Sequence, residues 1–169
     1  MSLGIAEELM QRDRSETYDV GMETAETKIR TSLSSNPTDS FLWLMIYSVK
    51  IARGGFDPKE VAFLEQSYHA GALEGWVSLR RNGLALSIFP LLTVSIQDTV
   101  VAEFAAIVDS GFLDEATAIL TSVGWEQRDR LLGGLQQVDI GARERLAKRL
   151  RRQGFKVGVP GVEMSDRPW

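Results

Sequence analysis

The hydrophobic residues of this chain recur at intervals of three and four positions, in segments of 11 to 18 residues separated by glycine and proline. This spacing places apolar side chains on one face of an α-helix. No segment has the sustained alternation typical of a β-strand. The pattern predicts an all-α fold of about seven to eight antiparallel helices joined by short loops, arranged as an α-solenoid or as a compact helical bundle.

The ends of several predicted helices carry recognisable signals. Thr38 or Asp39 is a suitable N-cap, Gly54-Gly55 ends the same helix, and Asp57-Pro58 has the cap-then-proline order of a helix start. The predicted helices span residues 15–33, 38–53, 57–71, 74–91, 98–110, 113–123, 126–138 and 142–153. Residues 5–12 are either a preceding helix or a frayed end. Residues 1–153 are therefore expected to form one helical domain, followed by an irregular tail over residues 154–169.

The run Phe41–Tyr47 is apolar on every face of its predicted helix. A helix of this kind has to be covered on more than one side. We expect it to be the central helix of the core, with Trp43 as the single position whose truncation costs the most stability.

Residues 25–80 resemble the tetratricopeptide repeat, a helix-turn-helix unit of about 34 residues. The matching positions are Ala25, Pro37, Trp43, Phe63 and Trp76. The two tryptophans are 33 positions apart, but the glycine and tyrosine that the family carries after each tryptophan are missing. The resemblance implies a helical-repeat scaffold that binds a protein or peptide partner in a groove and has no chemistry of its own.

Two short stretches, Asp39-Ser40-Phe41 and Glu74-Gly75-Trp76, resemble helical-repeat proteins of proteobacteria. This resemblance implies a bacterial source and, as an alternative function, a small-ligand or polysaccharide-related binding protein associated with surface-polysaccharide machinery.

Trp76, Arg80 and Arg81 are the candidate residues for that alternative. An arginine offers a fork of donors to a carboxylate or phosphate and stacks on an indole ring. The structural alternatives are a solvated helix face for the two arginines and core packing for the tryptophan.

The composition offers little for catalysis. The chain has 169 residues, one histidine and no cysteine, which leaves no thiolate nucleophile and no cysteine-based metal site. A second histidine and an Asp/Glu cluster at ligand spacing are both missing, so we expect neither a metal nor a cofactor. Gly133-Gly134 lies in a helix-like segment without the Lys-Ser/Thr of a phosphate loop. A non-enzymatic protein is the prediction.

The single histidine, His69, follows Tyr68 at a predicted helix end. A histidine there commonly interacts with the last carbonyl groups or stays solvated, and the alternative is a partner-binding or pH-sensing role for this pair.

The charge of the chain is unevenly distributed. Its net charge is -4, but residues 1–142 hold 11 basic against 20 acidic side chains, whereas residues 143–169 hold 8 against 3. The basic run consists of Arg143, Arg145, Lys148, Arg149, Arg151 and Arg152. We expect residues 143–153 to be an electrostatic docking element for an acidic partner, outside the core, with Arg145, Lys148, Arg149 and Arg152 as candidate contacts.

Other ligands fit the basic run less well. It lacks the aromatic residues that stack on nucleic-acid bases, and Leu146 and Leu150 are too few for strong membrane insertion. The structural alternative is that both leucines cap the stack of helices while the arginines are solvated or paired to acidic residues.

No apolar stretch reaches the roughly 20 residues of a membrane-spanning helix, since Leu84–Ile96 is short and interrupted by polar residues. No signal-peptide pattern is present in the first 15 residues. The cytoplasm is the default location, and the periplasm is the alternative if an upstream signal or anchor was removed.

Overall fold

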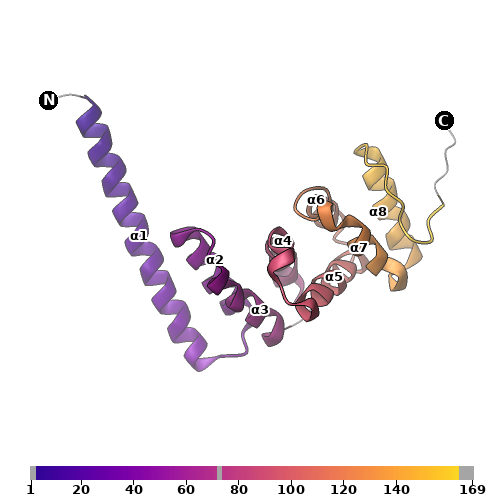
Figure 1. Cartoon of the computed structure of the whole chain (residues 1–169), viewed down its shortest axis with the longest axis horizontal. Coiled ribbons are helices and arrows are strands. Elements are labelled where there is room, and N and C mark those ends of the chain that lie inside the picture. Colours follow the sequence, from indigo (N-terminus) through magenta and orange to yellow (C-terminus); the bar gives the residue numbers. More distant parts are fainter. Residues whose placement is uncertain (1–2, 72–73, 164–169) are drawn as a thin grey trace. The chain divides into compact units, whose positions relative to one another are not determined.

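A computed structural model describes the backbone of residues 3–71 and 74–163, and the side chains from residue 18 onward within those ranges. The described residues form eight α-helices and four short 3₁₀ turns and contain no strand, which confirms the all-α prediction (Figure 1). The chain divides into two compact units, unit 1 (Met1–Gly71) and unit 2 (Ala72–Trp169). That both belong to one domain stays a prediction of the sequence.

Unit 1 is an arrangement of three helices in which α2 lies between α1 and α3 and contacts both (Figure 1). Its elements are α1 (Leu3–Ser35), α2 (Ser40–Gly54), the 3₁₀ turn η1 (Pro58–Glu60) and α3 (Val61–Ala70). The segments predicted at 5–12 and 15–33 are one continuous helix. Its first residues, up to residue 17, are described only as backbone.

The apolar run Phe41–Tyr47 occupies the middle of unit 1, as predicted. No residue of this run is exposed, and Leu44 and Ile46 have no accessible surface. Asp39 caps the helix by accepting a hydrogen bond from the backbone N–H of Leu42 at 3.0 Å. Packing on two sides, by α1 and by α3, is what a helix without a polar face requires.

Trp43 is only partly buried, so it differs from the deeply buried residue that the sequence led us to expect. Its ring stacks on Phe63 of α3 with centroids 6.1 Å apart, and its Nε1 donates a hydrogen bond to the carbonyl of Pro37 at 2.8 Å. Trp43 therefore links the α1–α2 turn to α3, while the fully buried apolar side chains of α2 are Leu44 and Ile46.

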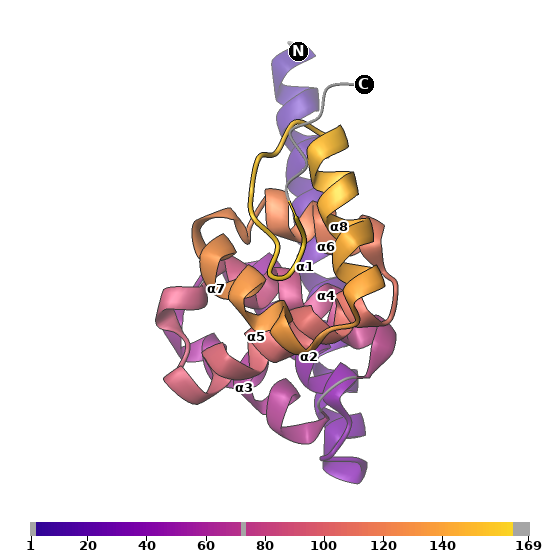
Figure 2. The same ribbon diagram turned by 90° about the vertical axis from the view of Figure 1, so that its right-hand side faces the viewer.

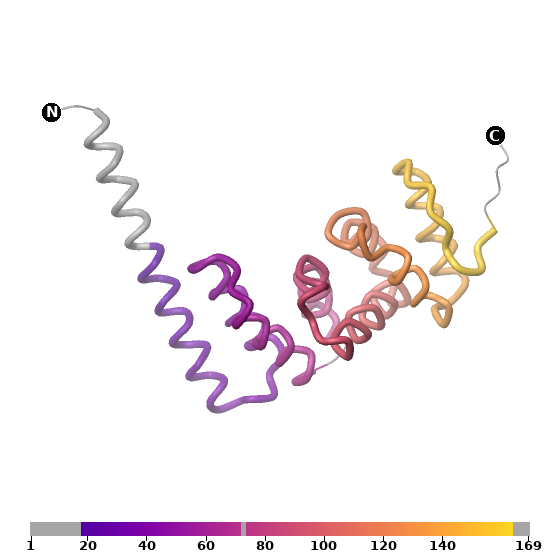
Figure 3. The backbone as a smooth tube through the Cα atoms, viewed as in Figure 1, coloured from indigo at the N-terminus to yellow at the C-terminus, as the bar shows by residue number. Residues whose placement is uncertain are grey.

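Unit 2 is built around α5, which contacts α4, α6, α7 and α8. Its elements are α4 (Gly75–Ser87), η2 (Phe89–Leu91), α5 (Val94–Asp109), α6 (Leu113–Thr121), η3 (Trp125–Gln127), α7 (Arg128–Gly133), η4 (Gly134–Gln137) and α8 (Ile140–Arg152). Val100, Phe104 and Val108, which follow one face of α5, have no accessible surface. The backbone trace in Figure 3 shows the short helices that follow α5 along the chain.

The segment 126–138, predicted as one helix, is broken into η3, α7 and η4. A close approach to α5 accompanies this difference. A Cβ added to Gly134 would lie 2.6 Å from Cγ1 of Val101, a separation that real side chains do not adopt. The glycine at position 134 therefore lets the backbone approach α5, which gives Gly134 a packing role.

Helix α8 is part of the core of unit 2, so the prediction that residues 143–153 lie outside it is wrong. Ala142, Leu146, Ala147 and Leu150 are buried, and α8 packs on α5 and α6. These four apolar residues are enough to bury one side of α8 because they lie on a single stripe of the helix. The small alanine side chains let α8 lie close to the neighbouring helices. The structural alternative, in which Leu146 and Leu150 cap the helices, describes the packing correctly.

The described part of the tail, residues 154–163, is irregular, and it folds back along α8 (Figure 2). Phe155 packs against Trp125 with ring centroids 5.2 Å apart, and Val159 is buried. Arg143 donates a hydrogen bond to the carbonyl of Pro160 at 2.6 Å. The remaining predicted tail, residues 164–169, lies outside the described residues.

We expect Gly134→Ala to destabilise unit 2 by about 1–3 kcal/mol, because the added methyl group meets the stiff β-branched side chain of Val101. Urea unfolding followed by circular dichroism measures this change. Gly133→Ala is the matched control, since its Cβ would enter open space and alanine stabilises a helix by roughly 0.5–1 kcal/mol relative to glycine. Equal effects of the two substitutions would contradict the close approach.

Candidate functional site

A basic pocket lies between the start of α6 and α8. It has a volume of about 370 Å³ and is lined by Leu113, Arg145, Lys148, Arg149, Arg152 and Gln153. The four basic residues that the sequence proposed as partner contacts on this helix therefore lie together around one concavity. Their spacing of i, i+3, i+4 and i+7 explains why they share one face of α8.

The orientation of this face follows from the packing of α8. Leu146 and Leu150 are buried against the core, so the neighbouring face with the basic residues is left at the surface. Asp139 caps the first turn by accepting a hydrogen bond from the N–H of Ala142 at 3.1 Å.

The positive charge of the pocket is only partly compensated. Arg149 forms an ion pair with Asp114 in the first turn of α6. Arg145, Lys148 and Arg152 have no carboxylate partner among the residues that the structure describes. The chemistry of the pocket is therefore that of an anion-binding surface, with guanidinium forks suited to carboxylates or phosphates.

The second group of candidates, on α4, does not share one surface. Trp76 is 61% exposed and Arg80 is also exposed, whereas Arg81 has no accessible surface. The prediction that Trp76 packs in the core is therefore wrong. The hypothesis that Arg81 binds a ligand at the surface is wrong as well.

Arg81 belongs to a buried polar cluster between α4 and α5. Its Nε and one terminal nitrogen donate to Oε1 of Glu103, at 3.1 and 2.5 Å. Asn82 donates to the backbone carbonyl of Val100 at 2.9 Å and to Oε2 of Glu103 at 3.3 Å. Since both charges are removed from water, each depends on the other for compensation.

Sequence reasoning did not find Glu103, although a signal was present. Glu103 lies among Val100, Phe104 and Ile107 on the apolar face of α5, where a lone carboxylate needs a buried partner. Arg81 lies on the corresponding buried face of α4, next to Val77.

Tyr68 and His69 point to different environments at the end of α3. Tyr68 is 4% exposed and belongs to the core of unit 1, whereas His69 is exposed in the last turn. The tyrosine is therefore not a surface contact for a partner.

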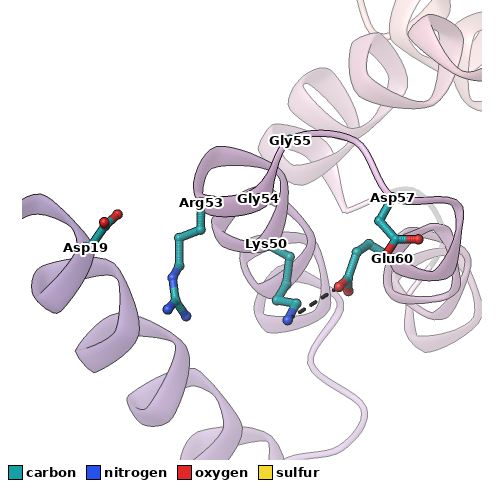
Figure 4. Close-up of a pocket in the computed structure, with 7 residues that line it drawn as sticks. All are labelled: Asp19, Lys50, Arg53, Gly54, Gly55, Asp57 and Glu60. Atoms are coloured by element: carbon teal, nitrogen blue, oxygen red, sulfur yellow. Dashed lines mark ion pairs between the residues drawn. The ribbon is translucent and has the colours of Figure 1, made fainter. Parts of the chain in front are cut away.

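A second pocket, in unit 1, has a volume of about 420 Å³ (Figure 4). It is lined by Asp19, Lys50, Arg53, Gly54, Gly55, Asp57 and Glu60. Figure 4 shows Arg53 extending toward α1 and Lys50 paired with Glu60.

The cations of this pocket already have carboxylate partners. Lys50 lies 3.4 Å from Glu60 and 3.7 Å from Glu26, and Arg53 lies 2.9 Å from Glu26. Glu26 also pairs with Arg30 in the next turn of α1. These ion pairs connect α1, α2 and η1, so the charges of this pocket hold the unit together and leave no unmatched cation for a ligand.

The pKa of Glu26 reflects this network. Burial, the strongest single influence, raises the pKa of this carboxyl group. Hydrogen bonds from Arg30 and Arg53 and the charges of Lys50 and Arg30 together outweigh burial, so the pKa of Glu26 lies below its ordinary value. The network therefore stabilises the ionised form in the folded state.

In the part of the chain that the structure describes, no group of three or more histidine, aspartate or glutamate side chains is placed to hold a metal ion. Within the same residues, no helix has the length and hydrophobicity needed to cross a bilayer.

Comparison of the chain with known protein families, with curated proteins and with solved structures finds no match.

We expect Glu103→Leu to destabilise unit 2 by about 3–5 kcal/mol, because Arg81 would remain buried without its counter-charge. The double variant Arg81→Met/Glu103→Leu should recover most of this loss, since both charges are then removed. Urea unfolding measures both values, and Arg80→Met, at the exposed neighbouring position, is the control with a change within about 0.5 kcal/mol. A double variant as unstable as the single one would show that the pair contributes packing that methionine and leucine cannot replace.

We expect Glu26→Gln to reduce the stability of unit 1 in a pH-dependent manner. Because the folded-state pKa of Glu26 is lowered, its contribution is complete above the unfolded value of about 4.3 and is lost as pH falls through the folded-state pKa. The difference in urea midpoint between wild type and variant should therefore be large at neutral pH and shrink in acid. Glu23→Gln, at an exposed position on the same helix, should show a small difference that does not follow this pattern.

Proposed function

We propose that this chain is a non-catalytic interaction module of the helical-repeat type, which binds an acidic segment of a partner protein in the basic pocket of α8. The observation that carries this proposal is the gathering of four basic side chains around one concavity, three of them without a carboxylate partner among the described residues. Like charges held this close repel one another, and an acidic ligand relieves the repulsion.

The dimensions of the pocket favour a short peptide segment. Arg145 and Arg152 are seven positions apart on α8, a rise of about 10 Å. An extended chain advances about 3.3 Å per residue, so three to four residues of a partner span the four cations. Leu113 adds an apolar contact for the aliphatic part of a glutamate or a neighbouring side chain.

Other anionic partners are less well matched. The pocket lining contains no aromatic ring on which a base would stack, which disfavours single-stranded nucleic acid. Its single leucine offers little apolar surface for insertion into a membrane. Both ligands are therefore competing outcomes of the experiment below.

The helical-repeat part of the proposal is supported by the positions that resemble a tetratricopeptide repeat. Ala25, Trp43 and Phe63 fall on the successive helices α1, α2 and α3, and Pro37 lies in the turn between the first two. The stacking of Trp43 on Phe63 links α2 to α3, which supports a repeat-like helix pair.

The small-ligand alternative has less support. It relied on Trp76, Arg80 and Arg81 acting together, and the guanidinium of Arg81 is buried with Glu103.

The experiment compares two arginines of α8 that differ in their relation to the pocket. Both side chains are exposed, but Arg152 lines the pocket and its neighbour Arg151 does not line it. With a fluorescein-labelled glutamate-rich peptide, we expect Arg152→Glu to weaken binding about tenfold and Arg151→Glu to weaken it about twofold, since the latter changes only the general field. Fluorescence anisotropy measures the Kd.

Affinity for the peptide should also fall as ionic strength rises, because exposed charges are screened beyond about 8–10 Å at physiological salt. Equal losses in the two arginine variants would overturn the assignment of the pocket. Binding of single-stranded DNA or anionic vesicles without binding of the peptide would overturn the choice of partner.

A further inference from the structure

The rim of the basic pocket carries an acidic side chain of the protein itself. Asp114 follows the pocket residue Leu113 in the first turn of α6, and its carboxylate is ion-paired with Arg149 of α8. One of the four cations of the pocket is thus already paired with a carboxylate of the chain itself. Its position shows the chemistry that the pocket accepts.

This contact goes beyond the usual role of an acidic residue at a helix start. Negative side chains in the first turn stabilise a helix through its dipole, and both Asp114 and Glu115 are placed for that effect. Asp114 also forms an ion pair with Arg149 of α8, whereas Glu115 has no ion-pair partner among the described residues.

We infer that Asp114 is an intramolecular competitor for the pocket, which an incoming partner carboxylate displaces from Arg149. This inference rests on the proposed function. The pair is accessible to solvent, with the side chain of Asp114 76% exposed and that of Arg149 37% exposed. Exposed ion pairs contribute little to stability, so a ligand can open this one without unfolding the helix.

The competitor determines which acidic ligands bind. A ligand with a single carboxylate that takes the place of Asp114 exchanges one ion pair for an equivalent one and gains almost nothing. A ligand with several carboxylates gains new pairs with Arg145, Lys148 and Arg152, which lack carboxylate partners among the described residues. Asp114 therefore acts as a specificity-determining residue for carboxylates that depend on Arg149, while Arg145, Lys148 and Arg152 stay open to the further acidic residues of a partner segment.

The test uses the protein of residues 1–169 and two labelled peptides of equal length, one with a single glutamate and one with three glutamates. We expect Asp114→Asn to tighten binding of the single-glutamate peptide about fivefold, because Arg149 is then available to it. Binding of the three-glutamate peptide should tighten by a smaller factor. The ratio of the two Kd values, which is the selectivity, should fall.

Glu115→Gln is the matched control, since it removes one negative charge from the same helix turn without touching Arg149. It reports the change in the general field, and we expect it to tighten binding of both peptides by the same factor, about twofold or less. Asp114→Glu keeps a carboxylate at this position and should therefore have the same selectivity as the wild type. In an Arg149→Gln background, Asp114→Asn should have no more effect than Glu115→Gln, since coupling between two residues requires both of them.

The possible failures are distinguishable. If the wild-type protein binds neither peptide and Asp114→Asn does not create binding, the proposed function is wrong. If the wild type binds the three-glutamate peptide but Asp114→Asn and Glu115→Gln change both Kd values equally, the competitor role of Asp114 is overturned and the proposed function stands.

Discussion

The burial of a narrow apolar stripe on α8 is the constraint on which the candidate site depends. Leu146 and Leu150 pack into the core of unit 2, and this contact fixes the rotation of the helix about its axis. A rotation by one residue, about 100°, would bury charged side chains and expose the leucines. The basic face is therefore held in place by packing, although none of its own side chains contributes to the core.

Three ion-pair arrangements in this chain differ in what surrounds them. Arg81 and Glu103 are removed from water, so neither is available to a ligand and the loss of either leaves an uncompensated charge. Glu26 joins three cations at a partly buried junction of helices, where the arrangement lowers the pKa of its carboxyl group. Arg149 and Asp114 remain in solvent, where an ion pair can exchange partners freely. Solvent access thus separates charges that hold the fold from charges that are able to bind.

The helical character of the chain and most helix ends follow from local sequence. Asp39, Gly55 and Gly111 act through capping or backbone conformation, which depends on near neighbours only, and both glycines adopt positive φ, at 73° and 83°. The close approach of Gly134 to Val101 was not predicted, because the two residues are far apart in the sequence. The start of α5 was predicted four residues late, since Thr93 caps a first turn that includes the exposed Val94.

The candidate site was predicted only in part, because some of its residues come together through contacts between helices far apart in the sequence. Arg145, Lys148, Arg149 and Arg152 were identified from their spacing on a single helix, which is local information. The contribution of Leu113 and Asp114 depends on how α6 packs against α8, and no pattern in the sequence specifies that contact.

Arg80 and Arg81 are adjacent and chemically identical, yet one is exposed and the other buried, because consecutive helix positions point about 100° apart.

An exposed, salt-sensitive set of cations has physical consequences for the kind of complex it forms. Cations at a surface attract an acidic partner over distances up to the Debye length, which increases the rate of association more than the final affinity. The apolar contribution of Leu113 is small, so little holds the partner once the charges are screened. If the basic pocket binds an acidic partner as proposed, the complex forms and dissociates quickly, and its selectivity comes mainly from the number and spacing of the partner's carboxylates.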